Sequence, residues 1–169
     1  VEWLDRPRPP GNYGMGAFYR SIDTILWGRK TYEVAVGFQR QGLKEAGFDP
    51  TKKNYVFSRT PPSEPAPDVA FMTRPIGAFA RQLRARPGKH IWMMGGAGLI
   101  ASFLDEGQID EFIIHIVPVL IGEGIPLLAP RHRTIPLALR SCRRYPDGVV
   151  RLHYAVGAQR RAPRKPRAA

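Results

Sequence analysis

The stretch IWMMGGAGLI, residues 91–100, is the most informative part of this sequence for the fold. Its first four residues are apolar, as in a buried strand, and the run stops at two adjacent glycines, Gly95 and Gly96. After Ala97 and a third glycine, Gly98, the chain is apolar again with helical spacing. A simple turn needs one glycine, so this cluster indicates a backbone that another group approaches closely.

The same passage from strand to helix occurs twice before this stretch. We predict strands at 23–28, 54–58, 69–72, 90–94 and 109–121, the last broken by Pro118, and helices at 13–22, 29–38, 76–88 and 97–107. Asn12 is the expected N-cap of the first helix. Residues 136–156 read as a hairpin in which Asp147-Gly148 is a two-residue turn. The alternation predicts one α/β domain, a mostly parallel sheet with helices on both faces and a C-terminal antiparallel hairpin.

Composition narrows the class of protein. The chain has 169 residues, 43% of them hydrophobic, which is enough for one globular domain. The single cysteine, Cys142, excludes an intrachain disulfide framework and a cysteine-rich zinc site, and makes a cytoplasmic location the simplest expectation. No apolar run reaches the length of a membrane span, so we expect neither a membrane partner nor a signal peptide.

The formal net charge of +12 raises the question of a nucleic-acid partner. Much of this charge lies in residues 158–169, a basic tail rich in proline and alanine that we predict to be disordered. The remaining charge is spread along the chain, which is typical of a solvated basic surface. A nucleic acid is therefore not the expected main partner, and anionic small molecules fit the charge equally well.

Three predicted strand ends carry groups that suit phosphate. Gly28 ends a strand, and Arg29, Lys30 and Thr31 open the following helix, where free amides and the helix dipole attract anions. Such residues can also be a helix start whose basic side chains face water. Because the carboxyl ends of parallel strands share one edge of a sheet, the three strand ends are expected to lie together.

The second of these strand ends carries Ser58 and Arg59, a pair suited to the 2′-phosphate of NADPH or, equally, to a capping serine beside a solvated arginine. The third is the glycine stretch 95–98, whose amides suit a pyrophosphate. Its spacing differs from the dinucleotide fingerprint G-x-G-x-x-G, so a tight strand-to-helix turn explains it as well.

Taken together, GRKTYE, NYVFSR, WMMGGAGL and VPVLIGEGIPLL resemble the dihydrofolate-reductase-like superfamily. The branch that they resemble is related to the reductase domain, the C-terminal one, of the bifunctional riboflavin-biosynthesis deaminase-reductase. The resemblance covers residues 3–156, within an expected reductase domain 1–157. It implies a three-layer fold, a homodimer and an NADPH-dependent reductase of a small heterocycle, with 5-amino-6-(5-phosphoribosylamino)uracil as the implied substrate.

The resemblance also assigns residues to the cofactor. Gly28, Arg29, Lys30 and Thr31 would meet its phosphates, and Ser58 and Arg59 its adenosine 2′-phosphate. The pyrophosphate and the nicotinamide side would be lined by Gly95, Gly96, Ala97, Gly98 and Leu99. The Gly95–Gly96 peptide bond is commonly cis in this superfamily, so a cis bond is expected here.

Two departures from the family pattern matter. Family members begin with a strand inside the sheet that carries a Ser-x-Asp-Gly turn, and this sequence starts after it, so we expect a sheet that lacks this interior strand. Dihydrofolate reductase proper places a carboxylate on its first helix, whereas the matching residues 12–21 contain no Asp or Glu. This difference argues against dihydrofolate as the native substrate.

The proton donor is open. Glu123, between two glycines in a predicted loop, is the best candidate, although an exposed loop carboxylate explains it as well. Tyr13 and Tyr32 are candidates for the substrate pocket or for the core. His115 is expected to be structural, and no metal-ligand cluster is expected.

The alternatives to the reductase are a dihydrofolate reductase, a non-catalytic nucleotide-binding module and a nucleic-acid-binding protein that depends on the tail.

Overall fold

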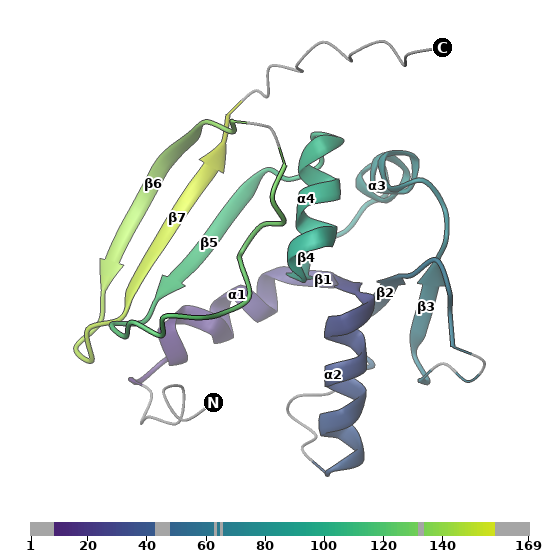
Figure 1. The fold of residues 1–169 in the computed structure, drawn as a ribbon, viewed down its shortest axis with the longest axis horizontal. Helices are drawn as coiled ribbons and strands as arrows, with labels where there is room; N and C mark the ends of the chain where they lie inside the picture. The colour runs from purple at the N-terminus through teal and green to yellow at the C-terminus, as the bar shows by residue number, and fades with distance from the viewer. Residues whose placement is uncertain (1–8, 43–47, 63, 65, 132–133, 158–169) are drawn as a thin grey trace. The chain divides into compact units, whose positions relative to one another are not determined.

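The computed structural model describes residues 9–42, 48–62, 64, 66–131 and 134–157. The predicted tail 158–169 and the first eight residues lie outside the described part. The chain forms two compact units (Figure 1). We call the unit of residues 14–108 and 123–129 the parallel unit, and the unit with the described residues of 1–13, 109–122 and 130–169 the antiparallel unit.

The parallel unit contains a four-stranded sheet in the order β3-β2-β1-β4. Its strands are β1 (Ile22–Gly28), β2 (Lys53–Phe57), β3 (Val69–Met72) and β4 (His90–Gly95). All three strand pairs are parallel. β1 pairs on both sides, and six of its seven residues are buried, which explains its nearly continuous apolar sequence. The predicted mostly parallel sheet is confirmed for these strands.

Helices cover both faces of this sheet, as predicted. On one face lie α1 (Met15–Ser21) and α2 (Arg29–Arg40). Phe18 of α1 packs edge-on against Trp92 of β4, with the ring centroids 5.3 Å apart, and Tyr32 of α2 packs against Phe71 of β3 at 5.1 Å. Their aromatic rings and the apolar β1 side chains form one continuous core layer.

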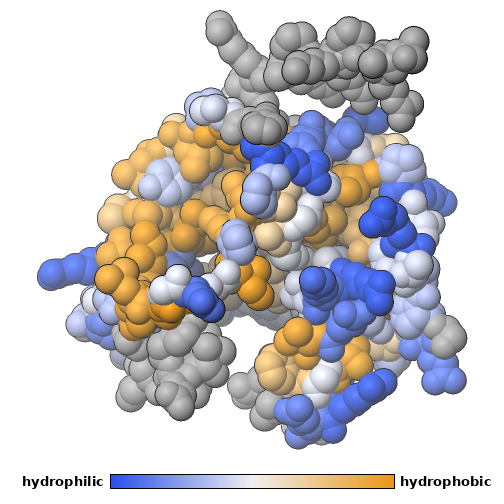
Figure 2. Space-filling view, in the orientation of Figure 1, coloured by the Kyte–Doolittle hydropathy of each residue, from blue (hydrophilic) through white to orange (hydrophobic). Residues whose placement is uncertain are grey.

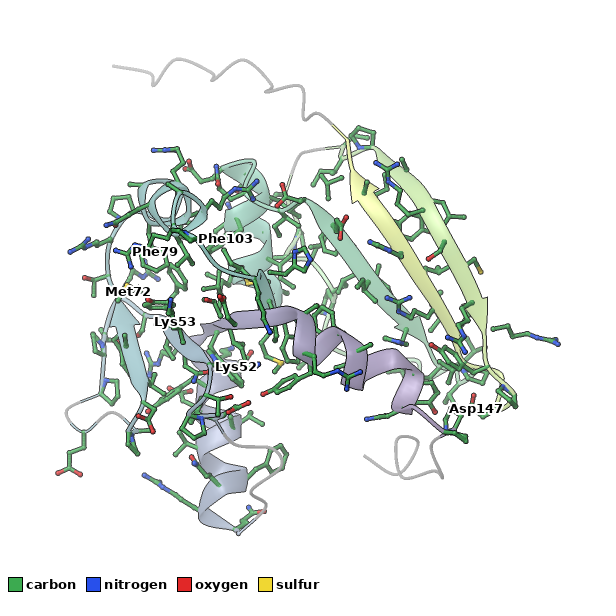
Figure 3. The ribbon with its side chains drawn as sticks, turned by 180° about the vertical axis from the view of Figure 1, so that it is seen from behind. Lys52, Lys53, Met72, Phe79, Phe103 and Asp147 are labelled. Carbon is green, nitrogen blue, oxygen red and sulfur yellow. The ribbon has the colours of Figure 1, made fainter. Side chains whose placement is uncertain are left out.

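The opposite face carries α3 (Ile76–Arg84) and α4 (Ala97–Asp105). The ring of Phe57 on β2 lies between Phe79 of α3 and Phe103 of α4, with centroid distances of 5.5 and 5.3 Å (Figure 3 labels the two helix residues). Helix, sheet and helix therefore make the three layers expected of the fold class.

The antiparallel unit contains β5 (Glu111–Ile116), β6 (Leu137–Arg144) and β7 (Val150–Val156), in the order β5-β7-β6. β6 and β7 are the predicted C-terminal hairpin, which is confirmed. Its loop is longer than predicted: the Tyr145 amide donates to the Val149 carbonyl, which leaves the three residues 146–148 in the loop. Gly148 adopts φ +88°, as the third residue of such a bulged loop requires.

Three expectations need correction. Among the described residues the strands form two sheets, because β5 pairs with β7 and β4 pairs only with β1, whereas the sequence pattern suggested a single sheet. The strand predicted at 109–121 ends at Ile116, two residues before Pro118. Asn12 is not an N-cap: it lies in a 3-10 turn with φ +45°, and Gly14 caps α1 without a side-chain hydrogen bond.

Candidate functional site

The candidate site lies at the carboxyl edge of the parallel sheet. β1 lies between β2 and β4, with Gly28 beside Phe57 of β2 and Trp27 beside Gly95 of β4. The segments that follow these strands, residues 29–31, 58–60 and 96–99, therefore leave the sheet at one edge. Figure 1 shows α2 and α4 both beginning at this edge. The structure thus brings together the three strand ends that the sequence singled out.

The glycines at this edge allow two backbones to meet. A Cβ atom on Gly28 would lie 2.9 Å from the Gly96 nitrogen and 3.0 Å from the Gly95 carbonyl oxygen. The φ of Gly28 is an ordinary −77°, so this close approach alone explains why the residue is glycine. Gly95 has φ +115°, a conformation that side chains disfavour, and the Gly95–Gly96 bond is cis, as expected from the resemblance. The group that approaches the glycine stretch is therefore the end of β1.

Two helices present their N-termini at this edge without side-chain caps. The N-cap residues are Gly28 for α2 and Gly96 for α4, and neither helix has a side-chain cap hydrogen bond or an acidic residue in its first turn. The first amides of a helix have no partner within it and carry the positive end of its dipole. The edge is therefore suited to anionic groups, and the side chain of Thr31 lies beside it, 3.6 Å from the position of a Cβ on Gly96.

Arg29 joins two of the strand ends. Its Nε donates to Oε1 of Glu33, one turn further along α2, at 2.7 Å, and its Nη1 donates to Oγ1 of Thr60 at 3.0 Å. Thr60 belongs to the segment that follows β2. Lys30 and Arg59 are both exposed at the same edge. The contact of Arg29 with Thr60 links the predicted phosphate segment after β1 to the predicted 2′-phosphate segment after β2.

Ser58 is buried, with 8% of its surface exposed, and its polar groups bond within the protein. Its hydroxyl donates to the Thr60 carbonyl at 2.9 Å and accepts from the Thr60 amide at 3.2 Å. Its own amide donates to the Met72 carbonyl at 3.3 Å. A phosphate oxygen needs a donor, and both donors of Ser58 are already used. The direct contact of Ser58 with a 2′-phosphate stays a prediction. In the structure, the Ser58 hydroxyl holds the backbone of Thr60.

The first turn of α4 contains the remaining cofactor candidates. A Cβ on Gly98 would meet no heavy atom within 4 Å, so open space lies beside this exposed glycine. The Leu99 amide donates to the Gly96 carbonyl at 2.9 Å, which closes the turn. The Ala97 carbonyl accepts from the Ala129 amide at 3.3 Å, so the segment 123–129 returns to the start of α4. Glu123, at the other end of this segment, is exposed.

Tyr32 and Tyr13 are the two residues that the sequence suggested for the substrate pocket. Tyr32 is 6% exposed, and its ring packs on Phe48 and Phe71 in the core of the parallel unit. Its hydroxyl accepts from the Ala66 amide at 3.0 Å, so Tyr32 has a packing role in the described structure. Tyr13 belongs to the antiparallel unit. A substrate contact for either residue stays a prediction.

Sequence reasoning missed Glu33 and Thr60. Glu33 had a detectable signal, because a carboxylate four residues after Arg29 on a helix can pair with it. Thr60 had none, because its contact with Arg29 depends on how β1 and β2 pair.

Among the residues that the structure describes, no cluster of His, Cys, Asp and Glu could hold a metal ion. Within the same ranges, no helix has the length and apolar character that a membrane span requires.

Comparison with known sequences identifies relatives of this chain. The family model described as the RibD C-terminal domain matches residues 49–151. The uncharacterised protein YwjB of Bacillus subtilis is 35% identical over 154 residues, which are 91% of this chain and 85% of YwjB. YyaP of the same organism is 37% identical, over 83% of this chain and 78% of YyaP. A 71-residue stretch is 35% identical to the riboflavin biosynthesis protein RibD of Corynebacterium ammoniagenes, over 41% of this chain and 21% of RibD.

Solved structures share the fold. A Shewanella protein whose name assigns it provisionally to riboflavin biosynthesis superposes with a TM-score of 0.74 at 23% identity, over 93% of this chain and 88% of that one. A Thermotoga maritima deaminase and 5-amino-6-(5-phosphoribosylamino)uracil reductase superposes with a TM-score of 0.60 at 15% identity. The match covers 86% of this chain and 48% of that one. The fold, the family model and the relatives agree: the chain belongs to the RibD C-terminal domain family of reductase-like proteins.

Proposed function

We propose that this protein is an NADPH-dependent reductase of a small heterocyclic substrate. The family is reductase-like, and the observation that carries the proposal is the convergence of α2 and α4 at one sheet edge. Their uncapped N-termini meet where the Gly28 and Gly95–Gly96 backbones touch. A dinucleotide carries several phosphate charges within a short span, and two adjacent helix N-termini with nearby cations suit that pattern.

The residues present fit such a cofactor. Arg29, Lys30 and Arg59 supply exposed positive charge at the edge, and the amides at the start of α2 and α4 supply donors. The open space beside Gly98 admits a group against the first turn of α4, where a side chain would intrude. Bound NADPH would supply the hydride. The protein residues would hold the phosphates and so orient the nicotinamide toward the substrate.

Reduction also needs a proton, and we assign its delivery to Glu123. The supporting observation is that the segment of Glu123 is tied to the start of α4 by the hydrogen bond of Ala129 with Ala97. General acid catalysis contributes about a hundredfold or more to the rate. We therefore expect Glu123→Gln to lower kcat at least tenfold. The Kd for NADPH should stay unchanged. An unchanged kcat would remove Glu123 from the chemistry.

The substrate that we propose is 5-amino-6-(5-phosphoribosylamino)uracil. Support comes from the activity that the Thermotoga maritima protein is named for and from the name of the Corynebacterium ammoniagenes relative. The basic charge of the chain also suits a phosphorylated substrate. A cytoplasmic location belongs to the same proposal, since riboflavin precursors and NADPH are both small molecules of the cell interior.

Two measurements test the proposal in order. Titration with NADPH and with NADH, followed by tryptophan fluorescence, should give saturable binding that prefers NADPH. Loss of the absorbance of the reduced nicotinamide should then depend on the uracil substrate, with dihydrofolate as the comparison. If only dihydrofolate is turned over, the protein is a dihydrofolate reductase and the uracil substrate is wrong. Saturable NADPH binding without turnover of any substrate would favour the nucleotide-binding module, and absence of binding would end the cofactor assignment.

We further propose a homodimer that forms through one face of the antiparallel sheet. The strand register puts mostly apolar residues on one face, with Cys142 and Arg144 towards the hairpin turn: Phe112, Ile114, Ile116, Val150, Leu152, Tyr154, Val156, Leu137, Leu139, Cys142 and Arg144. Ile116 and Leu139 are 51% and 56% exposed, and Figure 2 shows apolar side chains gathered over this sheet. An apolar face is complementary to its own copy, as a two-fold interface requires.

Light scattering tests the dimer. Leu139→Glu should give a monomer, because it buries a charge in the interface. Ser141→Glu is the matched control, since Ser141 is exposed on the same strand and its register partner His153 places it on the other face. A monomeric wild-type protein, or a dimer that survives Leu139→Glu, would contradict this assembly.

A further inference from the structure

We infer that Thr60, held by Ser58, positions the guanidinium of Arg29 for the 2′-phosphate of the cofactor. The inference rests on the proposed NADPH-dependent function and deepens it, because it names residues that separate NADPH from NADH. It also gives Ser58 an indirect role in place of the direct contact that the sequence suggested. Hydrogen bonds link Ser58 to Thr60 and Thr60 to Arg29.

The first step fixes the backbone of Thr60. Ser58 is anchored at the end of β2, where its amide donates to Met72 of the neighbouring segment at 3.3 Å. Its buried hydroxyl bonds both the amide and the carbonyl of Thr60, at 3.2 and 2.9 Å. A serine hydroxyl used in this way makes a compact local turn. The position of Thr60 therefore follows from that of β2.

The second step fixes the side chain of Arg29. The Thr60 hydroxyl oxygen accepts from Nη1 of Arg29 at 3.0 Å, and the Glu33 carboxylate accepts from Nε at 2.7 Å. These contacts lie on different nitrogens, so together they limit rotation of the guanidinium as well as its position. The Arg29 and Glu33 side chains are 57% and 52% exposed, so neither contact is buried and both depend on local geometry.

The third step relates this geometry to a phosphate monoester. The guanidinium keeps N–H donors that neither contact uses, and a planar fork of donors matches the oxygens of a phosphate. An exposed arginine loses side-chain entropy when it binds an anion, and an arginine that is already oriented loses less. The contact from α2 to the segment after β2 places these donors between two strand ends. A 2′-phosphate bound between these strand ends would use those donors, and a cofactor without that phosphate would not.

The Ser58 step separates this inference from direct binding. A direct ligand would need a donor, and the hydroxyl and the amide of Ser58 both donate within the protein. Loss of the Ser58 hydroxyl would release Thr60 and only thereby weaken the hold on Arg29. The effect of Ser58→Ala should therefore depend on the presence of Arg29.

The test uses the whole chain and two probes that differ by one phosphate, adenosine 2′,5′-bisphosphate and adenosine 5′-monophosphate. Calorimetric titration should show tighter binding of the bisphosphate to the wild-type protein. Thr60→Val should weaken the bisphosphate about fivefold and leave the monophosphate unchanged, because one hydrogen bond is lost. Thr60→Ser should restore the wild-type ratio, and Ser58→Ala should reduce it by a smaller factor.

Two further variants exclude a general structural effect. Thr51→Val removes a hydroxyl that bonds Asp49 just before β2, at the opposite end of that strand, and should leave both affinities unchanged. In an Arg29→Ala background, Thr60→Val and Ser58→Ala should have no further effect on the bisphosphate. Additive losses in that background would overturn the inference and indicate direct contacts. An unchanged ratio in Thr60→Val would overturn it as well.

Failure of the proposed function is recognised separately. If the wild-type protein binds neither probe, the nucleotide site itself is wrong, and the inference falls with it. If the wild-type protein binds both probes equally, a nucleotide site exists but does not read the 2′-phosphate, so the positioning role is wrong.

Discussion

The two units of this protein differ in how their sheets are covered. In the parallel unit, Ile22 and Val56 are completely buried between helical layers. In the antiparallel unit, every residue of β6 is exposed, and Leu139 keeps 56% of its surface. The parallel unit thus has a core on both faces of its sheet, whereas β6 of the antiparallel unit has no buried residue.

This difference relates to where the candidate site lies. The strand ends of the parallel unit can hold close backbone contacts, such as that of Gly28 with Gly96, because packed helices fix the strands on both faces. The antiparallel unit is fixed mainly around its hairpin turn, where Tyr145 is 6% and Val149 2% exposed. Tyr13 reaches the same turn, and its hydroxyl donates to Asp147, which Figure 3 labels. Rigidity is thus concentrated in different places in the two units.

The largest expected effect comes from removing a buried side chain from the parallel unit, in comparison with removing an exposed one from the antiparallel unit. Phe103→Ala should lower the free energy of unfolding by about 3–5 kcal/mol, since Phe103 is 2% exposed and packs against Phe57. Leu139→Ala should cost under about 1 kcal/mol in the monomer, because Leu139 is already half exposed. Urea unfolding at low protein concentration measures both. Equal losses would show that the antiparallel sheet is as well packed as the parallel one.

Next come two glycine variants at the strand-end site. Gly28→Ala should destabilise the protein by about 1–3 kcal/mol, because its Cβ would press on the Gly95–Gly96 backbone. Gly98→Ala meets no atom within 4 Å and lies in α4, where alanine is favoured by about 0.5–1 kcal/mol. Thermal unfolding should separate the two variants. If Gly98→Ala also leaves NADPH affinity unchanged, the space beside Gly98 is not used by the cofactor.

A smaller effect is expected at the hairpin turn of the antiparallel unit. The Tyr145 hydroxyl donates to the Tyr13 carbonyl at 2.8 Å, and Tyr145→Phe removes that bond while keeping the edge-on ring contact of the two tyrosines. We expect a loss of about 1 kcal/mol in the free energy of unfolding. Tyr154→Phe on β7 is a matched control in the same unit. A neutral Tyr145→Phe would show that ring packing alone holds the turn.

The smallest effects are in the pH dependence, which should differ between the units. Burial of the imidazole lowers the pKa of His115 in the antiparallel unit below its usual 6.5; the Arg151 charge acts the same way, and a hydrogen bond with the Tyr13 backbone opposes it. The unfolded chain then binds the proton more readily. Stability is therefore lost as the pH falls below about 6.5. In His115→Gln, the midpoint of urea unfolding should change less between pH 7 and pH 5 than it does in the wild-type protein.

The parallel unit should respond at lower pH. The Lys89 amide donates to the Asp23 carboxylate at 2.8 Å, and this bond chiefly holds the pKa of Asp23 below its usual 3.8. The charged carboxylate stabilises the fold above that value, and the contribution is lost as the pH falls through the lowered pKa. Asp23→Asn should reduce the change in urea midpoint below about pH 4. A change of the same size in this variant and in the wild-type protein would place the acid sensitivity elsewhere.

Much of the fold was predictable because local patterns determine local structure. The apolar runs of β1 and β4 and the helical spacing of α2, α3 and α4 are visible in the sequence, as is the Asp147-Gly148 turn. The division into two sheets was not, because an apolar strand pattern does not say which neighbour a strand pairs with. The role of Asn12 was also missed, since a capping residue and a residue in a 3-10 turn look alike in sequence.

The order of residues was enough to predict which elements form and which strand ends carry glycines, cations and hydroxyls. The contacts of those groups follow from how the elements pack. This packing places Gly28 against Gly95 and Gly96, Arg29 against Thr60, and Tyr32 in the core. The cause is the range of the interactions. Helix and strand formation depend on neighbours a few residues apart, whereas these contacts join segments far apart in the sequence through strand pairing and packing.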